Sequence, residues 1–199
     1  MMKAFVINLD SRPDRMKKFK QNIFPFEVTR FPAIKASCGE DGCTLSHLSI
    51  LREIGNDLNN YPFVVFEDDC VLVEPWHKVE NAISQLQYDG YAALWLGANP
   101  KKKLQRYSEN TFRLKNAWCL HAVVYNSYIM VQYILQHHNT PPGKNLDIFY
   151  CKKVMEKFNC FITYPIIATQ LSDRSDIAPG ITNNYDEIIL NYKKATNGK

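Results

Sequence analysis

The chain has 199 residues, and its 24 Lys and Arg against 20 Asp and Glu give a formal net charge of +4. With 46% hydrophobic and 22% charged residues, the composition is that of a globular protein and excludes a mainly disordered chain. The small positive charge gives no indication of nucleic-acid binding, and the length predicts a single domain.

Hydrophobic periodicity predicts strands that alternate with helices along the chain. We expect strands at residues 3–9, 26–31, 61–66, 91–96, 118–125 and 160–164. We expect a first helix that opens at 11–14, and further helices at 44–54, 75–86, 127–137, 146–157 and 186–194. The sequence also predicts a turn at Asp41-Gly42, a long polar loop at 98–115 and a chain break at 139–143. This order predicts an α/β fold with a mainly parallel sheet flanked by helices.

Cysteine usage and the N-terminal sequence favour a cytoplasmic setting. None of the six cysteines has C-x-x-C spacing, which argues against a zinc site and is compatible with reduced thiols. Residues 1–10 hold too short an apolar stretch for a signal peptide, and no apolar run reaches the ~20 residues that cross a bilayer. Peripheral contact of the C-terminal helix with a membrane is the weaker alternative. Frequent Asn, Lys, Ile and Tyr suggest an AT-rich genome, bacterial or viral.

An acidic triplet, Glu67-Asp68-Asp69, directly follows the apolar run at 61–66. Three adjacent carboxylates at the end of a buried strand repel each other and are costly to desolvate unless a cation compensates them. Strand periodicity places Glu67 and Asp69 on one side and Asp68 on the other, in the crevice where open α/β sheets bind ligands. The triplet therefore indicates either a site for a hard divalent cation or a solvated acidic turn.

Several segments resemble glycosyltransferase family 25, which includes bacterial lipooligosaccharide galactosyltransferases and collagen hydroxylysine galactosyltransferases. They follow the family's order across roughly residues 3–177. The segments are Val6–Arg15, Gly42–His47, Phe66–Asp69, Trp118–Leu135, Leu146-Asp147, Tyr164-Pro165 and Ser172–Ile177. One departure is His121, at a position where the family usually has a small residue, which suggests a different acceptor side.

The resemblance implies a GT-A-type nucleotide-sugar-binding fold over residues 1–178, followed by a tail at 179–199 with a short amphipathic helix. It also implies a UDP-sugar donor, a Mn²⁺ or Mg²⁺ ion, and inversion at the anomeric carbon of a transferred hexose, with galactose favoured. The acceptor is a hydroxyl on a glycan, a glycolipid such as lipooligosaccharide, or the hydroxylysine of a collagen-like protein. Partners are thus the nucleotide sugar and this acceptor; the oligomeric state is not predicted.

Within that interpretation, each candidate residue receives a role. Asp69 and Glu67 are the expected metal ligands, and Asp147 is the expected base that accepts the acceptor hydroxyl proton. The donor is expected to contact Asn8, Leu9 and Asp10 at the end of the first strand, and also Arg12, Arg15, Ser46, His47, Glu67 and Asp68. Arg12 and Arg15 are suited to phosphate, and Ser46 and His47 are expected in the first turn of a helix, where free amides favour an anion.

Structural alternatives remain open for several of these residues. Arg12 suits a solvated helix face equally well, and His47 suits a structural role. Asp147 could instead compensate the dipole of the helix that it begins. At the level of function, two alternatives are a catalytically silent nucleotide-sugar-binding protein and a metal-dependent phosphoester hydrolase. The hydrolase would need a second group of converging carboxylates, which the sequence does not clearly supply.

Overall fold

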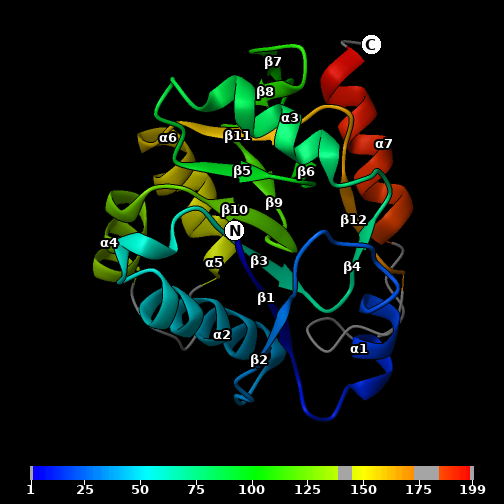
Figure 1. The fold of residues 1–199 in the computed structure, drawn as a ribbon, viewed down its shortest axis with the longest axis vertical. Helices are drawn as coiled ribbons and strands as arrows, with labels where there is room; N and C mark the ends of the chain where they lie inside the picture. Colours follow the sequence, from blue (N-terminus) through cyan, green and yellow to red (C-terminus); the bar gives the residue numbers. More distant parts are fainter. Residues whose placement is uncertain (1, 139–144, 173–183, 198–199) are drawn as a thin grey trace.

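The computed structural model describes residues 2–138, 145–172 and 184–197 (Figure 1). At its centre is an eight-stranded sheet in the order β2-β1-β3-β10-β5-β11-β8-β7. In that order the strands are Thr29–Pro32, Lys3–Asn8, Phe63–Glu67, Ala122–Tyr125, Ala93–Trp95, Cys160–Thr163, Thr111–Arg113 and Gln105–Arg106. Strands β10 and β8 run antiparallel to their neighbours, and the other strands all run in one direction. The prediction of an α/β fold with a mainly parallel sheet is therefore confirmed.

Helices cover both faces of this sheet, since its central strands alternate their apolar side chains between two cores. Phe63 and Val65 of β3 point into one core, and Val64 and Phe66 point into the other. Helices α1 (Pro13–Phe19) and α3 (His77–Leu86) pack on the second face. The first face is covered by α2 (Gly39–Ile54), α4 (Tyr128–His137), α5 (Leu146–Phe149), the π-helix η2 (Tyr150–Val154), α6 (Met155–Lys157) and α7 (Asn184–Asn197). Strands buried on both faces read as continuous apolar runs, as expected for 61–66.

Helix α2 begins earlier than the sequence predicted, and Asp41-Gly42 lies inside it instead of forming a turn. Cys38 is the N-cap, and its thiol accepts a hydrogen bond from the Asp41 backbone N–H. A Cβ at Gly42 would lie 2.7 Å from the Ile34 carbonyl oxygen. Because Gly42 has no side chain, it permits close contact with the preceding loop. In the sequence alone, a glycine required for such packing cannot be distinguished from a glycine that forms a turn.

The polar segment 98–115 is not a plain loop. It contains β6 (Asn99–Pro100), β7 and β8, and the last of these joins the central sheet against β11. Thr111, Phe112 and Leu114 are buried. These strands have two or three residues each, too few for an alternating pattern to identify them.

The expected strand 118–125 divides into β9 (Ala117–Trp118), which pairs with β6, and β10. The division occurs near Cys119, which has a φ of 80°. Two further short strands, β4 (Cys70–Leu72) and β12 (Ala168–Gln170), form a separate antiparallel pair that the sequence did not predict. A 3₁₀ helix at Leu58–Asn60 precedes β3.

Helix α7 is longer than the predicted 186–194 and lies alongside β6 and β12, as the red helix in Figure 1 shows. Ile188, Tyr192 and Ala195 are buried, and the Tyr192 hydroxyl donates a 2.6 Å hydrogen bond to the Thr163 carbonyl. Its apolar face thus belongs to the core. No helix of the described ranges has the length and apolarity needed to span a membrane. The predicted chain break at 139–143 and most of the motif at 172–177 lie outside those ranges.

Candidate functional site

A cavity of about 440 Å³ opens beyond the carboxyl ends of β1 and β3, beside helix α2. All three residues of the acidic triplet line it. Leu9, Arg15 and His47 line the same cavity. The structure therefore brings together candidates from the first strand, the first two helices and the end of β3, at the sheet edge where α/β folds place ligands.

The carboxylates of Glu67 and Asp69 lie on the same side of the chain, joined by one side-chain amide. Gln170 Nε2, from β12, lies 3.4 Å from Glu67 Oε2 and 3.3 Å from both carboxylate oxygens of Asp69. Asp68 instead accepts hydrogen bonds from Asn8 Nδ2 at 2.7 Å and from Arg15 Nη1 at 3.1 Å. The predicted alternation of the triplet is therefore seen in its hydrogen-bond partners.

The pKa values of all three carboxyl groups of the triplet are shifted from their usual values, and burial acts on each of them. Burial and the neighbouring charge of Glu67 raise the pKa of Asp69 to about 7, although Arg15 opposes the shift from 3.6 Å. Burial also raises the pKa of Asp68, against the opposing effects of Asn8 and Arg15. Burial disfavours the Glu67 carboxylate too, but the hydrogen bond and charge of His47, together with the charges of His121 and Arg15, outweigh it, and the pKa of Glu67 is lowered. A buried carboxylate and a partly buried one that face the same amide fit a hard divalent cation, which would relieve their repulsion.

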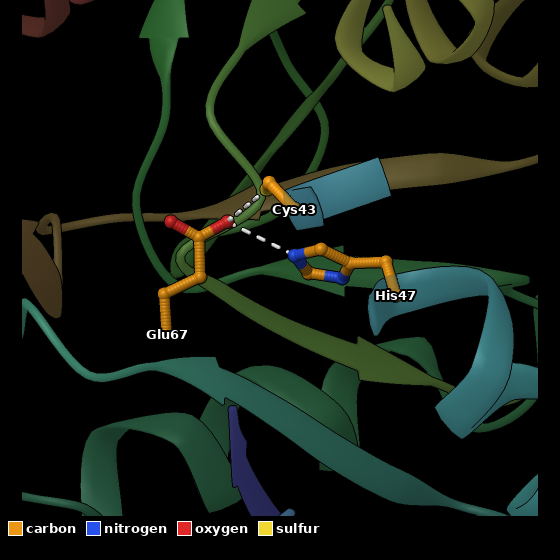
Figure 2. A group of neighbouring side chains, drawn as sticks. All are labelled: Cys43, His47 and Glu67. Carbon is orange, nitrogen blue, oxygen red and sulfur yellow. Dashed lines mark hydrogen bonds and ion pairs between the residues drawn. The ribbon is translucent and has the colours of Figure 1, made fainter. Parts of the chain in front are cut away.

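A second cluster shares Glu67 (Figure 2). His47 Nε2 lies 2.9 Å from Glu67 Oε1, and Cys43 Sγ lies 3.8 Å from the same oxygen. The three potential ligand atoms all lie within 4.8 Å of one another. Cys43 and His47 project from one face of α2 because they are four residues apart. Burial, together with the charges of Glu67, Asp147 and Asp69, raises the pKa of the Cys43 thiol well above its usual value.

Ser46 and His47 do not lie in the first turn of their helix, so that prediction is wrong. Helix α2 begins at Gly39, about two turns before them, because the residues taken for a turn are helical. The Ser46 hydroxyl is buried, donates to the Gly42 carbonyl at 2.6 Å and accepts from the Ile34 backbone N–H at 2.8 Å. Ser46 thus fastens the helix to the preceding loop, although it also lines the cavity.

The other residues expected at the donor lie outside the cavity lining: Asn8, Asp10 and Arg12. Asn8 is buried, and its side chain accepts from Arg30 Nε at 2.9 Å while donating to Asp68. Asp10 is exposed and paired with Arg30. The Arg12 guanidinium contacts Asp14 at 3.0 Å. Asn8 can therefore act on the site through Asp68, whereas Asp10 and Arg12 pair with Arg30 and Asp14.

Asp147 lies in the second residue of α5, close to the acidic triplet although not in the cavity lining. Its Oδ2 accepts a hydrogen bond from the Cys119 backbone N–H at 3.2 Å. Burial, followed by the charge of Glu67, raises the pKa of Asp147 to about 6. The carboxylate is thus ionised at neutral pH and basic enough to accept a proton.

His121 is fully buried where β9 leads into β10. Its carbonyl accepts the Glu67 backbone N–H at 2.9 Å, and its Nε2 would lie 2.9 Å from a Cβ at Gly97. Burial lowers the pKa of the imidazole, so it is neutral near pH 7. That His121 gives this protein a different acceptor side stays a prediction.

Sequence reasoning missed Gln170 and Cys43 as members of the site. No signal marks Gln170, because β12 has three residues and its position beside Asp69 depends on pairing with β4. The i, i+4 spacing of Cys43 and His47 is a metal-binding signal in the sequence that neither the C-x-x-C pattern nor the acidic triplet includes.

Comparison with known proteins supports one family. The family described as glycosyltransferase family 25 (LPS biosynthesis protein) matches residues 33–140. Among solved structures, A197 from STIV has a TM-score of 0.52 at 12% identity and covers 86% of both chains, which is a similarity of fold. An apo UDP-glucose pyrophosphorylase has a TM-score of 0.48 at 10% identity, over 99% of this chain and 80% of that one. A UTP-bound UGPase from Acinetobacter baumannii gives 0.47 at 11% identity, over 92% and 68%. Curated protein sequences give no significant match.

Proposed function

Because the chain belongs to glycosyltransferase family 25, we propose that it transfers a hexose from a UDP-sugar to a hydroxyl acceptor with inversion at the anomeric carbon. Galactose is the first donor sugar to test. The acceptor classes are a glycan, a glycolipid such as lipooligosaccharide, or a hydroxylysine. The observation that carries this proposal is the carboxylate pair of partly buried Glu67 and buried Asp69, which share one amide beside Arg15 in the cavity.

We assign Asp69 and Glu67 as the residues that would hold Mn²⁺ or Mg²⁺. Their oxygens are the ligand type that both ions prefer. When bound there, the ion supplies positive charge against the negative charge that develops on the leaving diphosphate. Gln170 holds the two carboxylates on one side of the chain, and Asp68 fixes Arg15 next to them.

Donor binding is assigned to the residues that line the cavity. Arg15 offers a guanidinium to the diphosphate, and Leu9 offers an apolar contact to the nucleotide. Asn8 acts as a positioning residue, because it holds Asp68 by a buried hydrogen bond. His47 holds Glu67 in its ionised form through the 2.9 Å contact.

The chemical step needs one proton acceptor on the acceptor side. Asp147 takes the proton from the acceptor hydroxyl while that oxygen forms a bond to the anomeric carbon. The bond between this carbon and the phosphate oxygen breaks, and UDP leaves on the opposite face. Attack opposite to the leaving group inverts the anomeric configuration, so an α-linked donor yields a β-linked product.

Two measurements test this proposal in sequence. Calorimetric titration with UDP should show binding that depends on Mn²⁺, and binding that is indifferent to the metal would contradict the assigned carboxylate pair. A panel of UDP-sugars with candidate acceptors should then yield a glycoside whose anomeric proton NMR signal reports inversion. A retained α-linkage would exclude the direct displacement described above. Metal-dependent UDP binding without any transfer would instead favour the silent binding protein.

A further inference from the structure

We propose that Cys43, His47 and Glu67 form a binding site for a thiophilic divalent cation, with zinc as the expected ion. This site is separate in chemistry from the carboxylate pair assigned to Mn²⁺ or Mg²⁺, but it shares Glu67 with that pair. Figure 2 shows the thiol of Cys43 and the ring of His47 both directed at the Glu67 carboxylate.

The distances suit tetrahedral zinc ligation. Ligand atoms at ~2.0–2.3 Å from a tetrahedral zinc ion lie roughly 3.3–3.8 Å apart. The Cys43 Sγ to Glu67 Oε1 distance is 3.8 Å, and the His47 Nε2 to Glu67 Oε1 distance is 2.9 Å. All three atoms lie within 4.8 Å of one another. Small side-chain adjustments therefore place an ion between them, and the fourth position stays open to water or substrate.

The chemistry of these ligands selects the ion. A sulfur and an imidazole nitrogen bind Zn²⁺ or Co²⁺ in preference to Mg²⁺ or Mn²⁺, which prefer oxygen. The two residues on α2 have the i, i+4 spacing with which helices present metal ligands on one face. Glu67, the last residue of β3, adds a negatively charged oxygen ligand.

The burial of its ligands makes the site more than a cluster of compatible residues. His47 is 1% exposed, and Cys43 is partly buried, so both ligands are held in place by packing and not by surface side-chain freedom. His47 Nδ1 is buried with no hydrogen-bond partner among the described residues. Metal binding at Nε2 would leave the ring proton on this nitrogen. That costs one unsatisfied hydrogen bond, against three new coordination bonds.

Because Glu67 belongs to both sites, zinc at this cluster removes a ligand from the carboxylate pair. Zinc should therefore compete with Mn²⁺-dependent UDP binding. This consequence depends on the proposed function, whereas zinc binding itself does not.

The test uses the reduced, metal-stripped chain titrated with Co²⁺ and then Zn²⁺ alone. We expect the near-ultraviolet thiolate-to-cobalt absorption band, its displacement by Zn²⁺, and an X-ray absorption spectrum of the zinc-loaded chain with one sulfur ligand at ~2.3 Å. Cys43→Ser should abolish the band and weaken Zn²⁺ binding at least ~100-fold, because even outer partners of zinc ligands contribute ~10–100-fold.

Cys38→Ser is the matched control, since this exposed residue caps α2 and a serine hydroxyl can accept the same hydrogen bond. The control should keep the band. A zinc spectrum without sulfur, or a cobalt band that survives Cys43→Ser, overturns the site. The X-ray absorption spectrum of the unsubstituted chain decides the matter even where Cys43→Ser does not fold.

A final experiment tests the zinc site and the proposed function separately. UDP titration with Mn²⁺ in zinc-free buffer tests the carboxylate pair alone. Added Zn²⁺ should then reduce UDP affinity at least ~10-fold, as expected for loss of one metal ligand. Unchanged affinity with zinc bound would overturn the competition.

Discussion

The Cys119 backbone N–H donates a 3.2 Å hydrogen bond to Asp147 Oδ2. Cys119 has a φ of 80°, a conformation that non-glycine residues rarely adopt. This backbone reversal between β9 and β10 directs the amide at the carboxylate. The bond favours the ionised form of Asp147, against the burial that raises the pKa of this carboxyl group.

Asp147→Asn should lower turnover by ~10²-fold or more while UDP affinity stays unchanged, because the amide cannot accept the acceptor proton. The asparagine oxygen can still accept the Cys119 N–H, so the local geometry is kept. Steady-state kinetics and UDP calorimetry measure the two effects. Near-normal turnover would remove Asp147 from the role of base.

The same substitution should stabilise the fold at neutral pH. The pKa of Asp147 is about 6 in the folded chain, against the usual 3.8 of an aspartate, so protonation favours folding. That contribution is complete below pH ~4 and is lost as the pH rises through about 6. Above this range Asp147→Asn should raise the free energy of unfolding by about 2 kcal/mol, less than the full shift implies because the side chain is partly exposed. Urea unfolding at about pH 8 should show the gain, and at about pH 3.5 the gain should vanish.

Turnover should depend on pH through Asp147. Since the base must be ionised, the rate should fall about tenfold per pH unit below an apparent pKa of about 6 or lower. The charge of Glu67 contributes to the raised pKa of Asp147, so a cation that offsets this charge shifts the apparent pKa downward. A pH–rate profile measures this limb. A rate that stays flat down to pH ~4 would contradict the assignment.

Asp69→Asn should abolish the metal dependence of UDP binding, because a neutral amide is a poor ligand for a hard cation. The fold should stay intact, since Asp69 is a buried acid whose ionisation is disfavoured by its surroundings. Calorimetry with and without Mn²⁺ measures the effect. Asp57→Asn is the matched control, because Asp57 caps the 3₁₀ helix at Leu58–Asn60 and asparagine can cap equally well. Metal-dependent binding that persists in Asp69→Asn would refute the ligand role.

Gln170→Ala should lower the metal-free free energy of unfolding by ~1 kcal/mol, because Glu67 and Asp69 lose the amide that faces both carboxylates. Mn²⁺ should recover most of this loss, since a bound cation performs the same charge compensation. Thermal unfolding with and without Mn²⁺ compares the variant with the unsubstituted chain. A loss that Mn²⁺ does not change would mean that Gln170 serves the β4–β12 pairing alone.

The sequence alone determined the fold class and the location of the acidic triplet. The apolar runs that became β1, β3 and β5 could be recognised because strands buried on both faces contain few polar residues. The opposite directions of Asp68 and its two neighbours follow from the two-residue period of an extended chain. The apolar runs and the alternation of side chains are both local properties, so they can be recognised in a single sequence.

Which residues meet at the site depends on contacts between segments that are far apart in the chain. Gln170 lies 101 residues from Asp69 along the chain, and it arrives there through a pair of three-residue strands that have no distinct pattern. Helix α2 begins at Gly39 and packs Gly42 against Ile34, so Ser46 and His47 lie about two turns from its N-terminus. Contacts between distant segments depend on packing, and packing is not encoded in the periodicity of either segment taken alone.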